Sequence, residues 1–242
     1  MAGHSKWNNI KDKKGKTDAQ RAKVFTKISR EIIVAVKEGG SGDPSSNSRL
    51  KDAIAKAKAA NVPNDNIKRV IDKAAHGGEN ASYESNVYEG YGPSGVAVIV
   101  ETMTDNRNRT ASEMRHFFDK YGGNMGTPGS VSWSFDRKGV LVIEAAGRDE
   151  DTVLMDALDA GAGDVEMRDE VFEIFTEPES FGSVRDALEE KEYAFLSAQV
   201  EMVPQNYIRL DNPDDIVKMR KLLDMLEDND DVQEVWHNWE ED

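Results

Sequence analysis

The first third of the chain repeats apolar residues at helical spacing. The stripe from Phe25 to Val36 predicts a helix over about residues 18–38, ended by a glycine pair. The same spacing predicts two further helices, over about residues 47–60 and 64–76. None of these short helices could bury its apolar face alone, so we expect the three to pack as a small bundle.

Beyond about residue 87 the period changes toward two, and strands alternate with helices. Residues 140–203 follow the order β-α-β-β-α-β, which is a complete ferredoxin-like series. The flanking segments each have the order strand, helix, strand; the first ends in a strand at Val131–Phe135 and the second begins with one at Tyr207–Leu210. The economical topology joins the two flanking segments into a second ferredoxin-like domain, and the alternative is two domains side by side in the sequence.

The prediction is therefore an α+β fold of three domains, an N-terminal three-helix bundle followed by two ferredoxin-like domains. We place a basic helical nucleic-acid-binding domain at residues 1–78. An α+β domain is expected from residues 79–135 plus 205–242, with a ferredoxin-like domain inserted at residues 136–204.

Composition narrows the class of protein. The chain has 242 residues, of which 38% are hydrophobic and 32% charged, as in ordinary water-soluble globular proteins. No apolar run approaches the ~20 residues of a membrane span, and the first residues do not resemble a secretory signal, so we expect a cytoplasmic protein with no membrane partner. Without cysteine, and with four histidines that lack ligand-like spacing, we expect no metal site, no cofactor and no small-molecule substrate.

The net charge of −15 conceals two parts of opposite sign. Residues 1–80 contain 17 Lys and Arg residues against 9 Asp and Glu residues, a net charge of +8. The remainder contains 14 basic and 37 acidic residues, a net charge of −23. A polyanion would therefore be bound by the N-terminal third and repelled by the rest of the chain.

The densest basic segment lies near the N-terminus and includes one tryptophan. Several cations can neutralise a row of phosphates, and an aromatic ring can stack on an unpaired base. The nucleic-acid-binding candidates in this segment are Lys6, Trp7, Lys11, Lys13, Lys14, Lys16, Arg21, Lys23, Lys27 and Arg30. The last three share one helix face. The alternative is a solvated helix face behind a lysine-rich tail that the tryptophan anchors.

Two more segments have features of anion-binding sites. Arg107 and Arg109 open a helix directly after an apolar strand, where free backbone N–H groups favour an anion. The alternative is an Asn or Asp N-cap followed by surface arginines that pair with acidic residues. The glycine-rich segment at residues 122–129 fits a helix end and a hairpin connection, and it matches neither a Walker loop nor a Rossmann turn.

No catalytic motif organises the many carboxylates, so we expect no catalytic residues. A carboxylate-based hydrolase acting on RNA or protein remains the enzyme alternative. The acidic runs at residues 227–231 and 240–242 fit solvated helix ends, or an acidic surface for a basic protein partner.

Several strings along nearly the whole chain resemble the YebC family, which includes the mitochondrial translational activator of cytochrome oxidase subunit one. The strings are Ala2–Lys11, Phe25–Lys27, Arg30–Ile32, Asn61–Pro63, Asn66–Ile67, Tyr88–Gly95, Thr104–Thr110 and Gly122–Asn124. The resemblance implies a helical N-terminal bundle with two α+β domains, and no catalysis.

The resemblance also implies two rival targets. Bacterial members are commonly described as DNA-binding transcriptional regulators. The mitochondrial relative is linked to translation on the ribosome, and bacterial members have more recently been linked to it as well. Duplex readout usually uses a two-fold dimer with a recognition element, and none is evident in the sequence. An acidic body with one basic face also suits a position between ribosomal RNA and basic ribosomal proteins. We therefore expect a ribosome-associated translation factor, with a DNA-binding transcriptional regulator as the alternative and a purely protein-binding adaptor as a third class.

Overall fold

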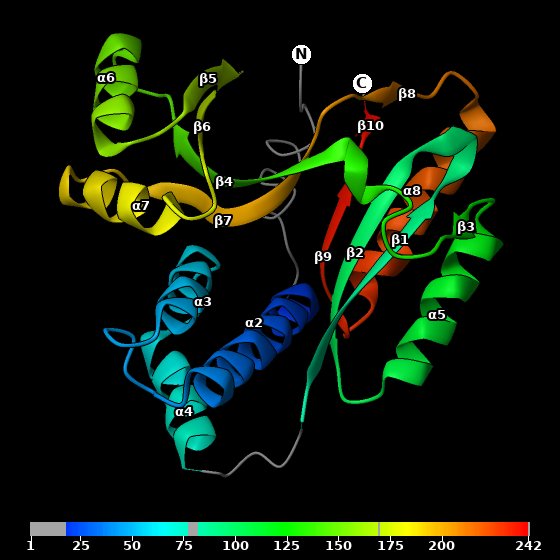
Figure 1. Cartoon of the computed structure of the whole chain (residues 1–242), viewed down its shortest axis with the longest axis horizontal. Helices are drawn as coiled ribbons and strands as arrows, with labels where there is room; N and C mark the ends of the chain where they lie inside the picture. Colours follow the sequence, from blue (N-terminus) through cyan, green and yellow to red (C-terminus); the bar gives the residue numbers. More distant parts are fainter. Residues whose placement is uncertain (1–17, 77–81, 169, 242) are drawn as a thin grey trace. The chain divides into compact units, whose positions relative to one another are not determined.

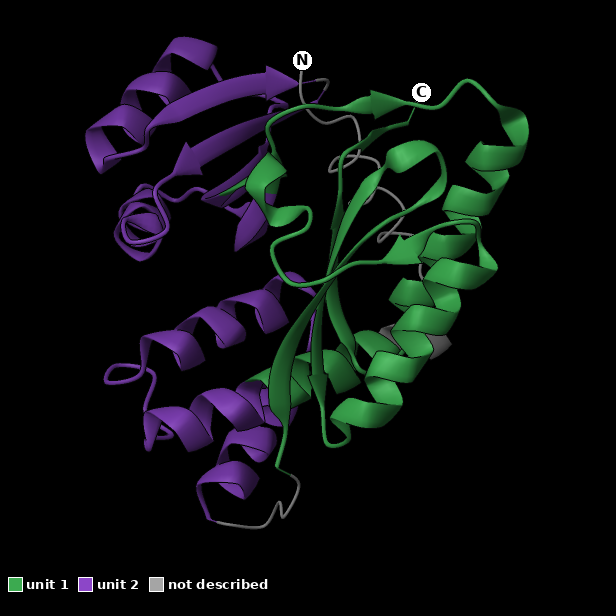
Figure 2. Ribbon diagram, turned by 45° about the vertical axis from the view of Figure 1, so that its right-hand side comes forward, with its two compact units in different colours: residues 1–31, 79–136, 203–242 green, residues 32–78, 137–202 purple. Residues whose placement is uncertain are grey.

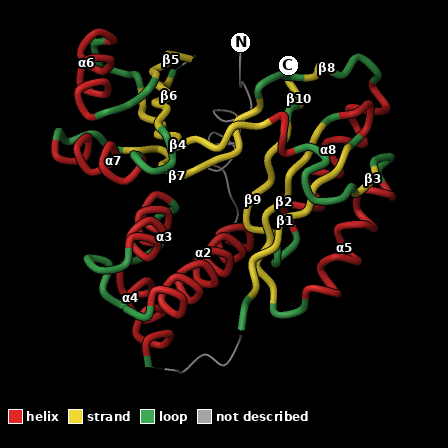
Figure 3. Tube along the Cα trace, in the orientation of Figure 1, coloured by secondary structure: helices red, strands yellow, loops and turns green. Residues whose placement is uncertain are grey.

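The computed structural model describes residues 18–76, 82–168 and 170–241, with side chains from residue 22 onward (Figure 1). The described residues form two compact units, coloured separately in Figure 2. Unit 1 takes its residues from 1–31, 79–136 and 203–242, and unit 2 from 32–78 and 137–202. The described chain contains helices and strands in antiparallel sheets (Figure 3), so the fold is α+β, as predicted. The boundaries of the three expected domains stay a prediction.

Three helices begin the described chain: α2 (Asp18–Gly39), α3 (Ser48–Ala59) and α4 (Asn64–Ala75), close to the predicted bounds. Asn47 is the N-cap of α3, and its side-chain oxygen accepts a hydrogen bond from the backbone N–H of Leu50 at 3.1 Å. Its side-chain amide donates to the carbonyl oxygens of Ala35, at 2.8 Å, and Ser41, at 3.0 Å. One buried side chain therefore joins the end of α2 to the start of α3.

Unit 2 contains the inserted sheet, and its element order confirms the predicted β-α-β-β-α-β series. The elements are β4 (Phe135–Glu144), α6 (Glu150–Ala160), β5 (Asp164–Arg168), β6 (Val171–Thr176), α7 (Phe181–Glu190) and β7 (Phe195–Pro204). The strand order β5-β6-β4-β7 is that of a ferredoxin-like sheet. Both helices pack on one core, where Leu141, Ile143 and Ile174 of the sheet meet Val153 and Leu188.

Unit 1 contains a second four-stranded sheet, in the order β3-β1-β2-β9. Its elements are β1 (Glu84–Tyr91), β2 (Ala97–Thr104), α5 (Arg107–Lys120), β3 (Asn124–Met125), α8 (Pro213–Asp228) and β9 (Val232–His237). Val98 and Val100 of β2 pack with Phe118 of α5 and with Met219 and Leu222 of α8, so both helices cover the same face. Segments more than 100 residues apart in the sequence thus share one sheet.

The strand predicted at Val131–Phe135 is wrong. Residues 132–134 form a 3₁₀ turn, η2 (Ser132–Ser134), and β4 begins only at Phe135. The cause is a distant carboxylate: Glu89 of β1 accepts hydrogen bonds from the backbone N–H groups of Val131 at 2.8 Å and Ser132 at 2.9 Å. These groups are therefore bound by a side chain and do not pair with a strand.

A second predicted strand lies outside this sheet. The segment predicted as a strand at Tyr207–Leu210 is reduced to β8 (Ile208–Arg209), which pairs in parallel with β10 (Trp239–Glu240) in a separate two-stranded sheet. The two central positions belong to β1 and β2, which pair antiparallel along their whole length. A tight turn joins the two strands, and the N–H of Gly92 donates to the carbonyl of Val96 at 2.8 Å.

Candidate nucleic-acid interface

The structure describes five of the twelve predicted nucleic-acid-binding side chains. Six of the others, Lys6, Trp7, Lys11, Lys13, Lys14 and Lys16, lie outside the described residues. Arg21 belongs to α2, but its side chain is also outside the described part. The five described side chains are Lys23, Lys27 and Arg30 of α2 and Arg107 and Arg109 of α5.

The three α2 cations contact the acidic C-terminal end of α8 and the loop after it. Lys23 forms an ion pair with the Asp228 carboxylate. Lys27 Nζ donates to the carbonyl oxygen of Glu227 at 2.7 Å, and Arg30 Nη1 donates to that of Asp230 at 2.7 Å. Carbonyls at a helix C-terminus carry partial negative charge, which favours cations there. This face of α2 is thus held by the acidic strip, which we define as residues 227–231.

Asp231, the last residue of the acidic strip, is a buried hub with 4% of its surface exposed. Its carboxylate accepts hydrogen bonds from Arg30 and Arg109, both at 2.8 Å, and from the hydroxyls of Thr110 at 2.8 Å and Thr104 at 3.0 Å. Burial raises the pKa of this carboxyl, but the four hydrogen bonds outweigh burial and hold its pKa below the usual value. Asp231 is therefore ionised at neutral pH, and it fixes the positions of both arginines.

The two α5 arginines have different environments. Asn106 caps the helix, and its side-chain oxygen accepts from the backbone N–H of Arg109 at 3.1 Å. The Arg109 guanidinium pairs with Asp105 at 3.0 Å as well as with Asp231. The hydrogen bonds that Arg109 donates to Asp231 and Asp105 raise its pKa. Arg107 is exposed, and its side chain forms no hydrogen bond or ion pair within the described part of the chain.

Some exposed cations were missed by the sequence analysis. Arg115 lies two turns beyond Arg107 on the same face of α5, and the spacing of eight residues could have indicated it. In unit 2, Lys58 of α3 and Lys68 and Arg69 of α4 are also exposed. Counting only described residues as partners, none of these four side chains has a hydrogen bond or an ion pair. They are among the described cations that are available to a phosphate, as is the exposed Lys221 of α8.

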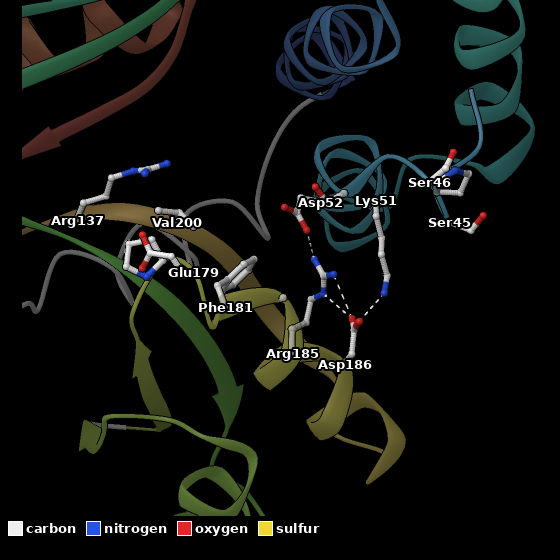
Figure 4. Close-up of a pocket in the computed structure, with 14 residues that line it drawn as sticks. Ser45, Ser46, Lys51, Asp52, Arg137, Glu179, Phe181, Arg185, Asp186 and Val200 are labelled. Carbon is white, nitrogen blue, oxygen red and sulfur yellow. Dashed lines mark hydrogen bonds and ion pairs between the residues drawn. The ribbon is translucent and has the colours of Figure 1, made fainter. Parts of the chain in front are cut away.

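Unit 2 also contains an open cavity of about 680 Å³, lined in part by α3 and α7 (Figure 4). The side chain of Arg185 is 3% exposed and pairs with Asp52 and with Asp186, and Lys51 pairs with Asp186 (Figure 4). Burial raises the pKa of Asp186, but hydrogen bonds from Lys51 and Arg185 outweigh it and lower the pKa. This network joins α3 to α7.

The charges around this cavity balance, because three basic and three acidic side chains line it. The basic ones are Lys51, Arg137 and Arg185, and the acidic ones are Asp52, Glu179 and Asp186. A balanced set does not favour an anion over water. The cavity is therefore a weaker candidate for a phosphate site than the exposed cations.

The described residues contain neither a helix that could span a membrane nor a group of side chains placed to hold a metal ion. None of the helices in that part of the chain has the length and apolar character needed to cross a membrane. No group of three or more His, Asp or Glu side chains within residues 22–76, 82–168 and 170–241 is arranged to hold a metal ion.

Two family models match most of the chain. The TACO1/YebC protein N-terminal domain matches residues 5–77, and the TACO1/YebC second and third domain matches residues 83–239. The chain belongs to the TACO1/YebC family. The predicted resemblance is thus confirmed, together with the layout of a helical N-terminal domain followed by two further domains.

Individual relatives agree with the family assignment. A protein of Acetivibrio thermocellus is 61% identical over 240 residues, and one of Finegoldia magna is 56% identical over 240 residues. Each alignment covers 99% of this chain and 99% of the relative, and both relatives carry the name "probable transcriptional regulatory protein". The crystal structure of the conserved hypothetical protein Aq1575 from Aquifex aeolicus superposes with a TM-score of 0.82 at 45% identity, covering 93% of this chain and 92% of that one.

Proposed function

We propose that this protein is a non-enzymatic regulator of gene expression that binds nucleic acid through its N-terminal third. The observation that carries the proposal is the charge division, +8 over residues 1–80 against −23 over the remainder. Phosphates are attracted to the first part and repelled by the second, which orients the protein on a polyanion. The names of the relatives support a regulatory role.

We further propose that the nucleic acid is ribosomal RNA and that the protein acts in the cytoplasm as a ribosome-associated translation factor. The exposed unpaired cations support this choice, because among the described residues they are spread over several elements, including α3, α4, α5 and α8. A duplex-reading protein concentrates its contacts on one recognition helix in the major groove. Dispersed cations fit the irregular backbone of a folded RNA better.

The acidic part of the chain has a role in the same proposal. Ribosomal surfaces combine RNA with basic proteins, and a part with a net charge of −23 attracts the latter. A DNA-binding transcriptional regulator is the second candidate, and the printed names of the relatives favour it.

The hydrolase alternative has less support from the described carboxylates. A general acid needs a raised pKa, whereas the hydrogen bonds to the buried Asp231 and to the partly exposed Asp186 outweigh desolvation and lower theirs. Both are held in ion pairs with arginines. They therefore stabilise the fold in this proposal and take no part in proton transfer.

The test is sedimentation of the purified protein with ribosomes over a salt series, beside titration with duplex DNA in the same buffers. The variant replaces Lys13, Lys14, Lys23 and Lys27 with glutamine. A matched control removes the same charge elsewhere, with Lys120, Lys138, Lys218 and Lys221 replaced by glutamine. Circular dichroism checks that both remain folded.

We expect ribosome binding that the first variant loses and the control retains, with only weak DNA binding that tolerates sequence scrambling. If about six phosphates are contacted on duplex DNA, log affinity falls with log salt at a slope near −5. Tight binding to one particular duplex without ribosome association would establish the transcriptional alternative. A variant that binds ribosomes like wild type would favour a protein-binding adaptor.

A further inference from the structure

Unit 2 carries a group of exposed apolar side chains on its sheet domain. Seven large apolar side chains are exposed in the described part of the chain. Three of them are scattered singly over unit 1, at Val87, Trp133 and Val217. The other four lie on α6 and β5, and we call them the α6–β5 surface: Leu154, Met155, Leu158 and Met167. Single exposed apolar residues are normal, whereas a group of them indicates a binding surface.

Three of these side chains form one stripe along α6. Leu154 and Leu158 are four residues apart, and Met155 is three residues before Leu158, so the three lie on one side of the helix. Val153 and Ala157, which pack on the sheet, are buried and lie beside this stripe. The apolar surface of α6 therefore continues from the core into solvent.

The second helix on this sheet has an ordinary polar outer side. The exposed residues of α7, which covers the same core, are Ser183, Glu189 and Glu190. A helix that only covers a core keeps polar residues on the side facing water. The exposed leucines and methionine of α6 are therefore not needed to cover the core.

Met167 extends the stripe from α6 onto β5. Both β4 and β5 pair antiparallel with β6, so they are parallel to each other, and the helix that connects them runs the opposite way. Met167 lies three residues along β5 from Asp164, about 10 Å. Leu154 lies six residues back along α6 from Ala160, about 9 Å, so it is level with Met167. Met167 faces the helices, because it is paired with Phe172 of their core.

Acidic residues flank the α6–β5 surface. Residues 148–170 contain nine Asp and Glu residues against two Arg residues, a net charge of −7. Asp151 lies one turn before Met155 on α6 and Asp159 one turn after it, and both are exposed. Counting described residues as partners, neither carboxylate has a hydrogen bond or an ion pair. Both are therefore available to a cation from outside the chain.

The two arginines of this range already have partners. The Arg148 guanidinium lies 4.6 Å from the centre of the Tyr193 ring. Arg168 forms an ion pair with Glu166, and its side chain is 19% exposed. Neither arginine neutralises Asp151 or Asp159. The surface is thus apolar with unpaired negative charge beside it.

This charge decides which partner fits the surface. A net charge of −7 repels nucleic acid and the anionic surface of a membrane. A second copy of this chain is repelled as well, because a two-fold contact would bring identical carboxylates together. A basic protein segment is attracted. The stems of its lysines and arginines can lie on the apolar stripe while their charges reach Asp151 and Asp159.

The spacing of the stripe indicates the form of that segment. Residues at i, i+3 and i+4 on α6 are the ridge on which a second helix packs. An amphipathic helix laid on an apolar strip is a common mode of protein recognition. Methionine side chains are flexible and adapt their shape to such a partner.

We propose that the α6–β5 surface binds an amphipathic basic helix of another protein. Its apolar side contacts Met155 and Met167, and its cations pair with Asp151 and Asp159. The inference rests on the proposed function, in which the acidic part of the chain contacts basic proteins of the ribosome. It adds the surface that makes this contact and the chemistry of the segment that it binds.

The experiment measures fluorescence anisotropy of labelled peptides of about 18 residues, five turns of helix, titrated with the full chain. The amphipathic probe has leucines on one side and lysines on the other. A scrambled probe has the same composition without the helical spacing, and an acidic probe has glutamate in place of lysine. Wild type is compared with Met155→Gln/Met167→Gln. The matched control is Val87→Gln/Val217→Gln, which replaces two half-exposed apolar side chains of unit 1.

A second pair of variants tests the charges. Asp151→Asn/Asp159→Asn removes the two unpaired carboxylates beside the stripe. Its control, Asp211→Asn/Asp224→Asn, removes two exposed carboxylates of unit 1. Circular dichroism checks that all four variants remain folded.

We expect wild type to bind the amphipathic probe more tightly than the scrambled probe, and not to bind the acidic probe. The methionine variant should weaken amphipathic binding roughly 10- to 100-fold, because two apolar contacts are lost. The aspartate variant should weaken it roughly 2- to 30-fold at low salt, and this difference should shrink as salt is added. Both controls should bind like wild type.

Sedimentation with ribosomes separates this inference from the proposed function. We expect the methionine variant to bind ribosomes more weakly than wild type and its control to bind them equally well. Full ribosome binding by the methionine variant would overturn the ribosomal source of the helix. Equal binding of the amphipathic and scrambled probes, or amphipathic binding that neither variant weakens, would overturn the surface itself. The proposed function would then still stand on the loss of ribosome binding in the four-lysine variant. Absence of ribosome binding by wild type would overturn the proposed function, whatever the peptides show.

Discussion

The buried carboxylate of Asp231 gives the sharpest test of the structure, through the substitution Asp231→Asn. The change preserves the shape of the side chain and removes its charge, leaving two guanidinium groups without their shared counter-ion. Removing one partner of a buried ion pair costs about 3–5 kcal/mol. Water can reach part of the site, because the side chains of Arg30 and Arg109 are 17% and 44% exposed. We therefore expect a loss at the lower limit, about 3 kcal/mol.

Thermal unfolding followed by circular dichroism measures this loss at neutral pH. For a chain of this size, 1 kcal/mol shifts Tm by about 2–4 °C, so the Asp231→Asn variant should melt about 6–12 °C lower. The control is Asp228→Asn, which breaks an ion pair whose side chains are 39% and 70% exposed. An exposed pair of this kind contributes at most about 1 kcal/mol.

The pH dependence provides an independent check with a definite sign. Because the folded-state pKa of Asp231 is lowered, its contribution is present above the unfolded pKa of 3.8 and is lost as pH falls through the folded value. Wild type and Asp231→Asn should therefore converge in stability in acid and differ most at neutral pH. The reasoning is refuted if Asp231→Asn is no more destabilised than Asp228→Asn, or if the difference between variant and wild type is independent of pH.

Other predictions follow from single contacts. Burial lowers the pKa of His237 to about 4, so between pH 6.5 and 4 the unfolded chain binds a proton there that the folded chain does not. The free energy of unfolding should therefore fall as pH falls through this range, and urea titrations of His237→Gln should show a smaller fall. Gly139→Ala would place a Cβ atom 2.2 Å from Thr176 Oγ1 and should cost about 1–3 kcal/mol in urea unfolding, whereas Gly182→Ala on α7 meets no atom within 4 Å and should gain about 0.5–1 kcal/mol. Asp228→Asn frees a lysine of α2 and should raise ribosome affinity at low salt more than removal of another exposed carboxylate of α8; unchanged affinity would contradict competition between the acidic strip and phosphate.

Helical periodicity was sufficient to predict all the long helices of the described chain, because each buries one stripe of apolar residues. Strand β1 was missed because its own sequence has no such apolar pattern. Its sequence, Glu84–Tyr91, carries two glutamates, an asparagine and a glycine, which are residue types depleted in strands. It is a strand because it pairs with the strongly apolar β2 at all eight positions. Gly90 also permits close approach to β3, since a Cβ there would lie 2.6 Å from the Asn124 carbonyl oxygen.

The error at Val131–Phe135 has a longer-range cause. Alternating apolar and polar residues predict a strand when backbone groups are free to pair with a neighbour. Here Glu89, about 40 residues earlier, takes up those N–H groups. The same carboxylate that defeats the local pattern produces the exposed position of Trp133. The pattern contained the tryptophan but gave no indication that a buried acid would hold it at the surface.

Charge counting has a similar limit at the candidate interface. It identified the basic third of the chain, and the helical spacing placed Lys23, Lys27 and Arg30 on one face, as the structure shows. It could not show that this face meets the acidic strip some 200 residues later. Phosphates must therefore compete with carboxylates and helix-end carbonyls for these cations. The exposed Lys23 pair is weak and screened by salt, whereas Arg30 is held by a buried charge. A polyanion should consequently displace the acidic strip from the lysines first and leave Arg30 in place, so that Arg30 fixes the helix while the lysines bind.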